Sequence, residues 1–153
     1  MTNQQIAEIL RSLSTQHCLR KADRIEEDEE EFTGKLDLRH LSLWATDVSR
    51  LVRDICQLNM ETSGMMSSIN LSFNNLLSDE GAIALANHLP RSLSEVHLVD
   101  CGIGDLGGTA ILEWMDSAHG LRIINLEQNN ISRAMRERFE AFANDNPHVM
   151  IVL

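Results

Sequence analysis

The chain has 153 residues, of which 43% are hydrophobic, so it has the length of one domain and enough apolar residues for a core. Its formal net charge is −10, which argues against a nucleic-acid partner because phosphate binding needs clustered Lys and Arg. Six of its 23 acidic residues form one run at positions 26–31, so the acidity is largely local.

The three cysteines, Cys18, Cys56 and Cys101, have no Cys-x-x-Cys spacing. They predict no disulfide framework and fit a reducing compartment. No stretch has the apolar length of a signal peptide or the about 18 residues of a membrane-spanning helix. The sequence therefore predicts a cytoplasmic protein without a membrane partner, and it leaves open delivery into another cell by a specialised export system.

Residues 1–34 predict an N-terminal helical cap followed by an acidic segment. Thr2 or Asn3 can cap a helix that runs to about Leu19, with apolar residues such as Ile6 and Leu10 on one face. We expect this face to cover the open end of the following structure, and docking onto another protein is the alternative. The acidic run 26–31 is typical of a solvated linker or of the charged face of a short helix, and a site for a basic partner is the alternative.

Four segments between residues 35 and 153 share the pattern aliphatic-x-aliphatic-x-x-(Asn, Cys or Leu)-x-aliphatic. They start at residues 36, 69, 96 and 124, so the spacings are 33, 27 and 28 residues. Each segment predicts a short strand with one buried face. Apolar residues at helical period then predict helices at residues 47–59, 79–89, 105–118 and 132–144, with Ile83 and Leu106 among the apolar positions. Residues 149–153 predict a closing strand.

These segments resemble the L-x-L-x-x-N/C-x-L core of leucine-rich repeats, and the period near 28 is similar to that of the ribonuclease-inhibitor subclass. The resemblance covers about residues 35–153. It departs from the pattern at Leu41, at five extra residues in or near positions 61–65, and at Met135 and Arg136. It implies an α/β fold, a short leucine-rich repeat solenoid of about four repeats. Its parallel β-sheet is concave, its helices are convex, and an N-terminal helix caps it.

The resemblance also implies a structural role for the Asn/Cys row, formed by Asn74, Cys101 and Asn129. In this family that side chain points inward and satisfies backbone groups where the strand turns, and an unbonded buried group costs about 1–3 kcal/mol. The alternative is a catalytic Cys101 or Cys18, although a buried thiol without a basic neighbour is inert.

The side chains that flank the buried aliphatic residues are expected to face solvent on the concave face. The predicted lateral rows are Lys35, Ser68, Glu95 and Ile123; Asp37, Asn70, His97 and Asn125; Arg39, Ser72, Val99 and Glu127; and His40, Phe73, Asp100 and Gln128. An exposed Phe73 amid polar groups is the kind of anchor that dominates interfaces, and folding down against a neighbour is its alternative. Trp44 is a second candidate anchor, and packing in the core or cap is the preferred interpretation of this residue. The predicted partner-binding residues are Arg39, His40, Asn70, Phe73, His97, Asp100, Asn125 and Glu127.

Motifs for catalysis or ligation are missing: there is no HExxH, no Cys-x2-Cys, no GxSxG and no His pair at a ligand spacing. The glycines at 102–108 are better explained by tight turns than by phosphate binding. The sequence predicts no catalytic residue, metal or cofactor. It predicts a non-catalytic protein-interaction module, monomeric or weakly oligomeric, acting as an adaptor or an effector. The alternatives are a self-associating assembly subunit and a cysteine-dependent enzyme.

Overall fold

The computed structural model of the chain describes residues 1–28, 30–64 and 66–153. Two residues lie outside it. Glu29 belongs to the acidic run, and Met65 belongs to the segment predicted to hold the extra residues of the first repeat.

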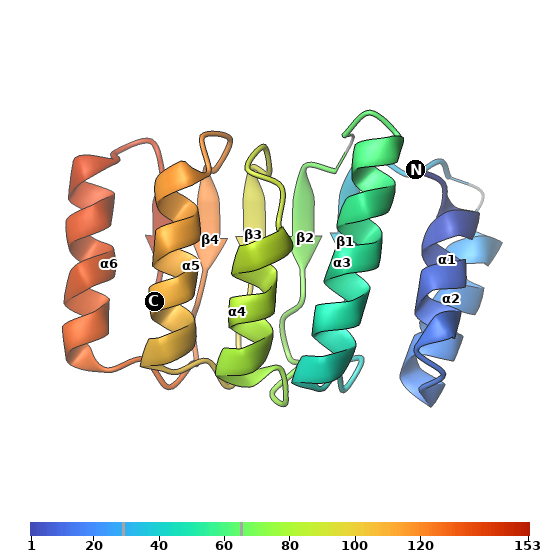
Figure 1. Cartoon of the computed structure of the whole chain (residues 1–153), viewed down its shortest axis with the longest axis horizontal. Coiled ribbons are helices and arrows are strands. Elements are labelled where there is room, and N and C mark those ends of the chain that lie inside the picture. The colour runs from blue at the N-terminus through green and yellow to red at the C-terminus, as the bar shows by residue number, and fades with distance from the viewer. Residues whose placement is uncertain (29, 65) are drawn as a thin grey trace.

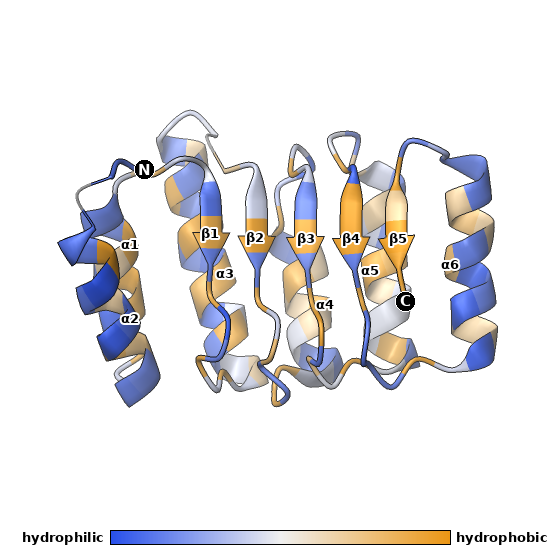
Figure 2. Cartoon of the chain, turned by 180° about the vertical axis from the view of Figure 1, so that it is seen from behind, coloured by the Kyte–Doolittle hydropathy of each residue, from blue (hydrophilic) through white to orange (hydrophobic). Residues whose placement is uncertain are grey.

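The described residues build an α/β solenoid around one five-stranded parallel sheet, as the repeats predict. The strands lie side by side in chain order, because each turn of the solenoid adds one strand next to the last (Figure 1). Figure 2 looks onto the open face of the sheet, with the helices behind the strands, and we call this open face the concave face. The strands are β1 (Lys35–Asp37), β2 (Ser68–Asn70), β3 (Glu95–His97), β4 (Ile123–Asn125) and β5 (Met150–Val152).

A helix follows each of the first four strands, close to the predicted positions. These helices are α3 (Ala45–Glu61), α4 (Ser78–His88), α5 (Asp105–Ser117) and α6 (Arg133–Asp145). The Asp79 carboxylate of α4 accepts hydrogen bonds from the backbone N–H groups of Gly104 and Gly107, at 2.7 and 2.8 Å, and thereby caps the start of α5. The Asp105 carboxylate accepts from the Ser132 N–H in the same way at the start of α6. Each carboxylate therefore joins one repeat to the next and satisfies donors that a helix start leaves open.

The prediction of one N-terminal helix reaching Leu19 is wrong, because the segment forms α1 (Asn3–Ser12) and α2 (Gln16–Glu27). Ser14 has the left-handed φ of 58°, which ends the first helix, and the Thr15 hydroxyl accepts a hydrogen bond from the Cys18 N–H to cap the second. The two helices pack against each other at one end of the solenoid, and α1 contacts α3 (Figure 1).

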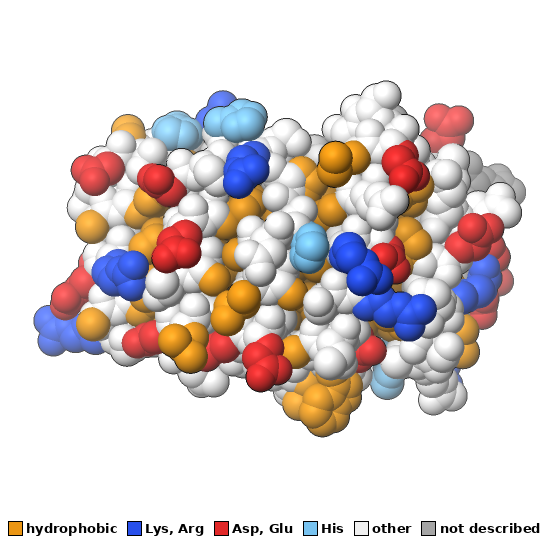
Figure 3. Space-filling model, in the orientation of Figure 1, with side chains coloured by type: hydrophobic (Ala, Val, Ile, Leu, Met, Phe, Trp, Pro, Cys, Tyr) orange, Lys and Arg blue, Asp and Glu red, His pale blue; other side chains and the backbone are white. Residues whose placement is uncertain are grey.

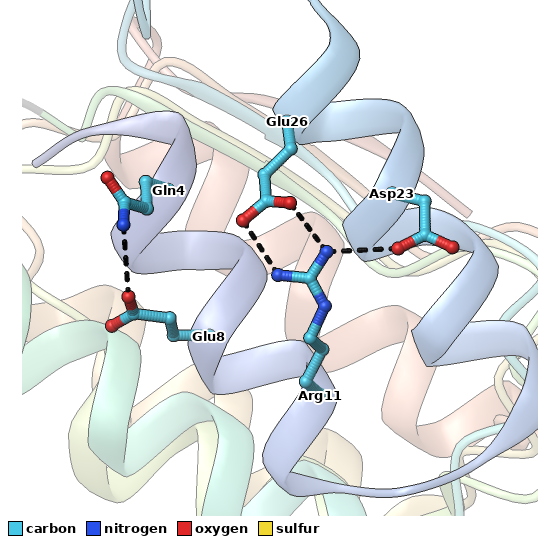
Figure 4. A network of polar contacts seen from close by, with 5 residues as sticks. All are labelled: Gln4, Glu8, Arg11, Asp23 and Glu26. Atoms are coloured by element: carbon cyan, nitrogen blue, oxygen red, sulfur yellow. Dashed lines mark hydrogen bonds and ion pairs between the residues drawn. The ribbon is translucent and has the colours of Figure 1, made fainter.

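The described part of the acidic run lies against these helices. Arg11 of α1 binds Glu26 and Asp23 of α2 through its guanidinium nitrogens, at distances from 2.6 to 2.9 Å (Figure 4). The Asn3 side chain donates a hydrogen bond of 2.8 Å to the Glu30 carbonyl oxygen. Glu26 and Glu27 thus end α2, and the Glu30 backbone lies beside the start of α1.

The core is one continuous cluster that runs along the inner face of the sheet into the helices. Its strand contribution is an aliphatic row in which no residue is more than 3% exposed: Leu36, Ile69, Val96 and Ile124. Two helical positions depart from the prediction, because Ile83 is 40% and Leu106 is 73% exposed. Among the described residues, no helix is long and apolar enough to cross a membrane.

Candidate functional site

The concave face carries lateral rows of side chains that the parallel register brings together. Asp37, Asn70, His97 and Asn125 are consecutive partners across the four strands, and Lys35, Ser68, Glu95 and Ile123 form a second row. Neighbouring strands lie about 4.8 Å apart, so side chains in one row are close enough to touch one ligand. The strand register therefore determines which groups a partner meets together.

The turn just after each strand carries a third row, made of His40, Phe73, Asp100 and Gln128. All four have left-handed φ values between 49° and 63°, a conformation that is uncommon for residues other than glycine. Hydrogen bonds from neighbouring repeats hold this conformation, since the N–H of Phe73 donates to the Val99 carbonyl at 2.7 Å and that of Asp100 to the Glu127 carbonyl at 3.0 Å. The backbone of the solenoid thus fixes where these side chains leave the surface.

Two members of the turn row make a stacked aromatic pair. The rings of His40 and Phe73 are parallel within 2° and their centroids lie 4.6 Å apart. Phe73 remains 37% exposed, so it neither stands free in solvent nor folds into the core. A flat aromatic surface shared by two repeats is able to contact an apolar side chain of a partner.

Polar residues at the strand ends are already engaged with their own backbone. The side-chain oxygens of Asp37, Asn70 and Asn125 each accept a hydrogen bond from the N–H two residues ahead, at 2.9 to 3.2 Å. Arg39 also binds the Asp37 carboxylate at 2.9 and 2.8 Å, and this contact is the main reason that the pKa of Asp37 lies below its usual value. These groups shape the strand ends and have limited capacity left for a ligand.

Asn125 completes the same pattern by donating its amide to the Glu127 carboxylate at 2.9 Å. His97 replaces the Asp or Asn in the third repeat, and its Nε2 lies 3.8 Å from a Glu95 oxygen. The predicted site residues that remain least committed are His97 of the strand row and His40, Phe73 and Asp100 of the turn row.

The prediction that every row residue faces solvent is wrong for two serines. Ser72 is 3% exposed because its hydroxyl accepts a hydrogen bond of 3.1 Å from the Val99 N–H. In the other three repeats the Asp or Asn at the strand end accepts the bond from the equivalent N–H, and His97 does not. Ser68 is 7% exposed, since its side chain is short and its row neighbours, Lys35 and Glu95, are long.

The Asn/Cys row lies beneath the turn row. Asn74 is fully buried, accepts hydrogen bonds from the N–H groups of Leu41 and Leu43, and donates to the carbonyls of Leu38 and Leu71. Asn129, which is partly exposed, makes the equivalent contacts with Cys101, Ile103, Leu98 and Leu126 and one more with Glu127. Both amides join the loops of two successive repeats.

The cysteines lie in surroundings that suppress thiolate formation. Burial raises the pKa of Cys101 and Cys56 to about 12, and it also raises the pKa of Cys18. The Cys101 thiol donates a hydrogen bond of 3.3 Å to the Leu71 carbonyl. Because the thiolate is the reactive form, such groups lack the activation that a nucleophile needs. Within residues 1–28, 30–64 and 66–153, no three metal-ligating side chains group together.

Two surface features, a groove beside Trp44 and a basic stripe on α2, were not recognised in the sequence. Trp44 is 61% exposed, so the preferred interpretation, packing in the core or cap, is wrong, and its side chain lines a groove of about 560 Å³ with Leu76, Ile83 and Leu106. Figure 3 shows hydrophobic side chains gathered at the lower edge, below the start of α3. The second feature is a basic stripe on α2, which becomes visible only once the helix is known to start at Gln16.

A family model described as Leucine Rich repeat matches residues 65–86 and 90–112. The first match contains β2 and most of α4, and the second contains β3 and the first half of α5. No curated protein matches the chain. The two matched repeats, with the strand–helix order that surrounds them, support the leucine-rich repeat family for this chain.

Proposed function

We propose that this chain is a non-catalytic protein-binding module that holds its partner on the concave face, as an adaptor or an effector in the cytoplasm. Leucine-rich repeats are commonly protein-interaction modules, and the extended open sheet of a solenoid suits this role. A fold does not determine a role, so the binding surface is assigned from the residues of the site.

The observation that carries the proposal is the exposed His40–Phe73 stack at the centre of the least committed residues. Aromatic anchors supply most of the energy of many interfaces, and surrounding polar groups supply fit and orientation. His97 and Asp100 flank the stack, and Arg39, Asn70, Asn125 and Glu127 form the rim of the proposed site. Residues 1–34 act as the cap of the solenoid, with Ile6, Ala7 and Leu10 of α1 buried. The repeat period near 28 supports the ribonuclease-inhibitor-like subclass.

The test starts from the partner that co-purifies with the chain from its native source. We expect Phe73→Ala to weaken capture of this partner by about 2 kcal/mol or more, which corresponds to about 25-fold in affinity. Phe73→Asn gives a second variant whose side chain tolerates the left-handed turn and lacks the ring. Met60→Ala is the control, because Met60 is also apolar and is 79% exposed, but lies on helix α3.

Retained binding in both Phe73 variants, with loss of binding on substitution of Arg50 or Glu113 on the helices, contradicts the concave-face proposal. Thermal unfolding of each variant separates a binding loss from a folding loss.

A second candidate is self-association through the edge of the sheet. Met150 in the last strand, β5, is 61% exposed, and an exposed edge strand is a template for another chain. Light scattering over a concentration range distinguishes the two candidates. A mass that grows with concentration and returns to the monomer value in Met150→Lys favours self-association.

A further inference from the structure

Helix α2 presents a row of basic side chains toward β1. His17, Arg20, Lys21 and Arg24 are spaced i, i+3, i+4 and i+7, which places them on one face of the helix. They line a hollow of about 410 Å³, and its other wall consists of Asp37, Arg39, His40 and Leu41. Helix α2 and residues 37–41, at the first strand of the concave face, therefore enclose one hollow.

Two of the three acidic side chains of α2 are directed away from the basic row. Asp23 and Glu26 bind Arg11 of α1, at 2.9 and 2.6 Å (Figure 4). Those carboxylates are consequently directed toward α1, and neither lines the hollow. Figure 4 shows Arg11 and the two carboxylates meeting between α1 and α2. The third acidic side chain, Glu27, is exposed at the end of the helix, three residues beyond Arg24, and does not line the hollow.

The hollow itself has a strong excess of positive charge. Four of the 13 Lys and Arg residues of the chain line it, Arg20, Lys21, Arg24 and Arg39, against the single carboxylate of Asp37. That carboxylate is bound on both oxygens by Arg39. Among the described residues Arg20 and Arg24 make no ion pair, whereas Lys21 also lines a second hollow with Asp28, Glu30 and Glu31. The two arginines are therefore the main cations for an incoming anion, in a chain whose net charge is −10.

The basic hollow joins the aromatic surface of the concave face, because His40 lines the hollow and also stacks on Phe73. We propose that the concave face takes an acidic segment of a partner protein, with its carboxylates against Arg20, Lys21 and Arg24 and an apolar side chain on the His40–Phe73 stack. This inference rests on the proposed function and names the chemistry of the partner.

A carboxylate-rich peptide fits better than a nucleic acid. The guanidinium groups of Arg20 and Arg24 match the two oxygens of a carboxylate. A long polyanion, in contrast, is repelled by the negative charge over the rest of the chain. The hollow holds only a few side chains, and it adjoins one aromatic pair, whereas single-stranded nucleic acids use a charged groove with successive stacking rings.

The test is selection of peptides from a random 12-residue display library on the full chain. The measured quantity is the mean net charge of the enriched peptides. The test variant is Arg20→Glu with Arg24→Glu, at two exposed positions, and the control is Arg50→Glu with Arg133→Glu, which changes the net charge equally on helices α3 and α6. A second variant, Arg20→Gln with Arg24→Gln, removes the cations without adding carboxylates. Thermal unfolding of each variant checks that it is folded.

We expect the intact chain and the Arg50/Arg133 control to enrich peptides rich in Asp and Glu with an apolar residue among them. Representative peptides bind the Arg20/Arg24 variants at least tenfold more weakly, and their binding to the intact chain weakens as salt rises. Enrichment of neutral or basic peptides, no enrichment, or equal weakening in the control overturns the inference. The inference is also overturned if the chain binds no peptide but binds a dT12 oligonucleotide or phosphatidylserine vesicles, and this binding depends on Arg20 and Arg24.

The two proposals fail in different ways. If the native partner is lost by Phe73→Ala but retained by the Arg20/Arg24 variants, the concave-face function stands and the acidic-segment inference is wrong. If the native partner is retained by the Phe73 variants, the proposed function itself is wrong, whatever the peptides show.

Discussion

Replacement of Asn74 by leucine tests whether the Asn/Cys row holds the repeats together. Leucine has a similar size, so the change removes hydrogen bonds and leaves no large cavity. Within the described part of the chain, the substitution takes away the one acceptor of the N–H groups of Leu41 and Leu43 and the side-chain donor to the Leu38 carbonyl. The Leu71 carbonyl keeps the Cys101 thiol at 3.3 Å.

The magnitude follows from those three backbone groups. An unsatisfied buried group costs about 1–3 kcal/mol, so the three together cost at least about 3 kcal/mol. That is a large part of the about 5–15 kcal/mol by which a domain is stable. With a urea dependence of up to about 3 kcal/mol/M, we expect the unfolding midpoint to fall by about 1 M or more.

Asn75→Leu is the matched control, since it makes the same chemical change one residue away at an exposed position. Its free energy of unfolding should change by no more than about 0.5 kcal/mol. Asn74→Cys should fall between the two, because a thiol can donate to a carbonyl, as Cys101 does, but is a weak acceptor. Urea unfolding followed by far-UV circular dichroism measures all three variants. Coincident midpoints for Asn74→Leu and Asn75→Leu would show that the Asn/Cys row does not hold the repeats together.

Three further predictions concern packing, cooperativity and the thiols. Gly102→Ala should lower the free energy of unfolding by about 2 kcal/mol or more, because a Cβ there lies 2.5 Å from the Asn75 carbonyl oxygen. Gly64→Ala, at nearly the same φ and with open space around it, should lower it by about 1 kcal/mol, and equal urea midpoints for the two variants contradict the steric argument. Because repeats stabilise only their neighbours, the 1–120 fragment, which lacks β4, α6 and β5, should unfold at lower denaturant than the whole chain, and an unchanged midpoint argues against the solenoid. The three buried cysteines should react slowly with a thiol reagent at neutral pH and rapidly in urea, and one fast thiol in the folded chain favours the cysteine-dependent enzyme.

The solenoid could be predicted because every repeat carries the same local pattern of apolar residues. The alternation around Ile69, Val96 and Ile124 determines both the strand and the face that it buries, and the shared pattern then aligns one strand with the next. The break at Ser14 was missed because the apolar period of α1 continues through Leu13, and the left-handed turn leaves little signal in a sequence.

Features that depend on distant neighbours could not be predicted in the same way. The helical period of apolar residues predicts that Leu106 is buried. Its side chain is 73% exposed, because no other element covers that position. The His40–Phe73 stack joins residues of two repeats, and only the fixed turn geometry makes the rings parallel. The basic hollow needs α2 to lie next to β1, which no pattern within residues 1–34 specifies.

Binding on the concave face is tested most directly by the footprint of the native partner on the isotopically labelled chain, followed by nuclear magnetic resonance as the partner is added. We expect the largest shifts at residues 37–40, 70–73, 97–100 and 125–128, with small changes on the outer faces of α3 to α6. Shifts concentrated on those outer helix faces, with the strand ends and turns unchanged, would contradict a concave binding site.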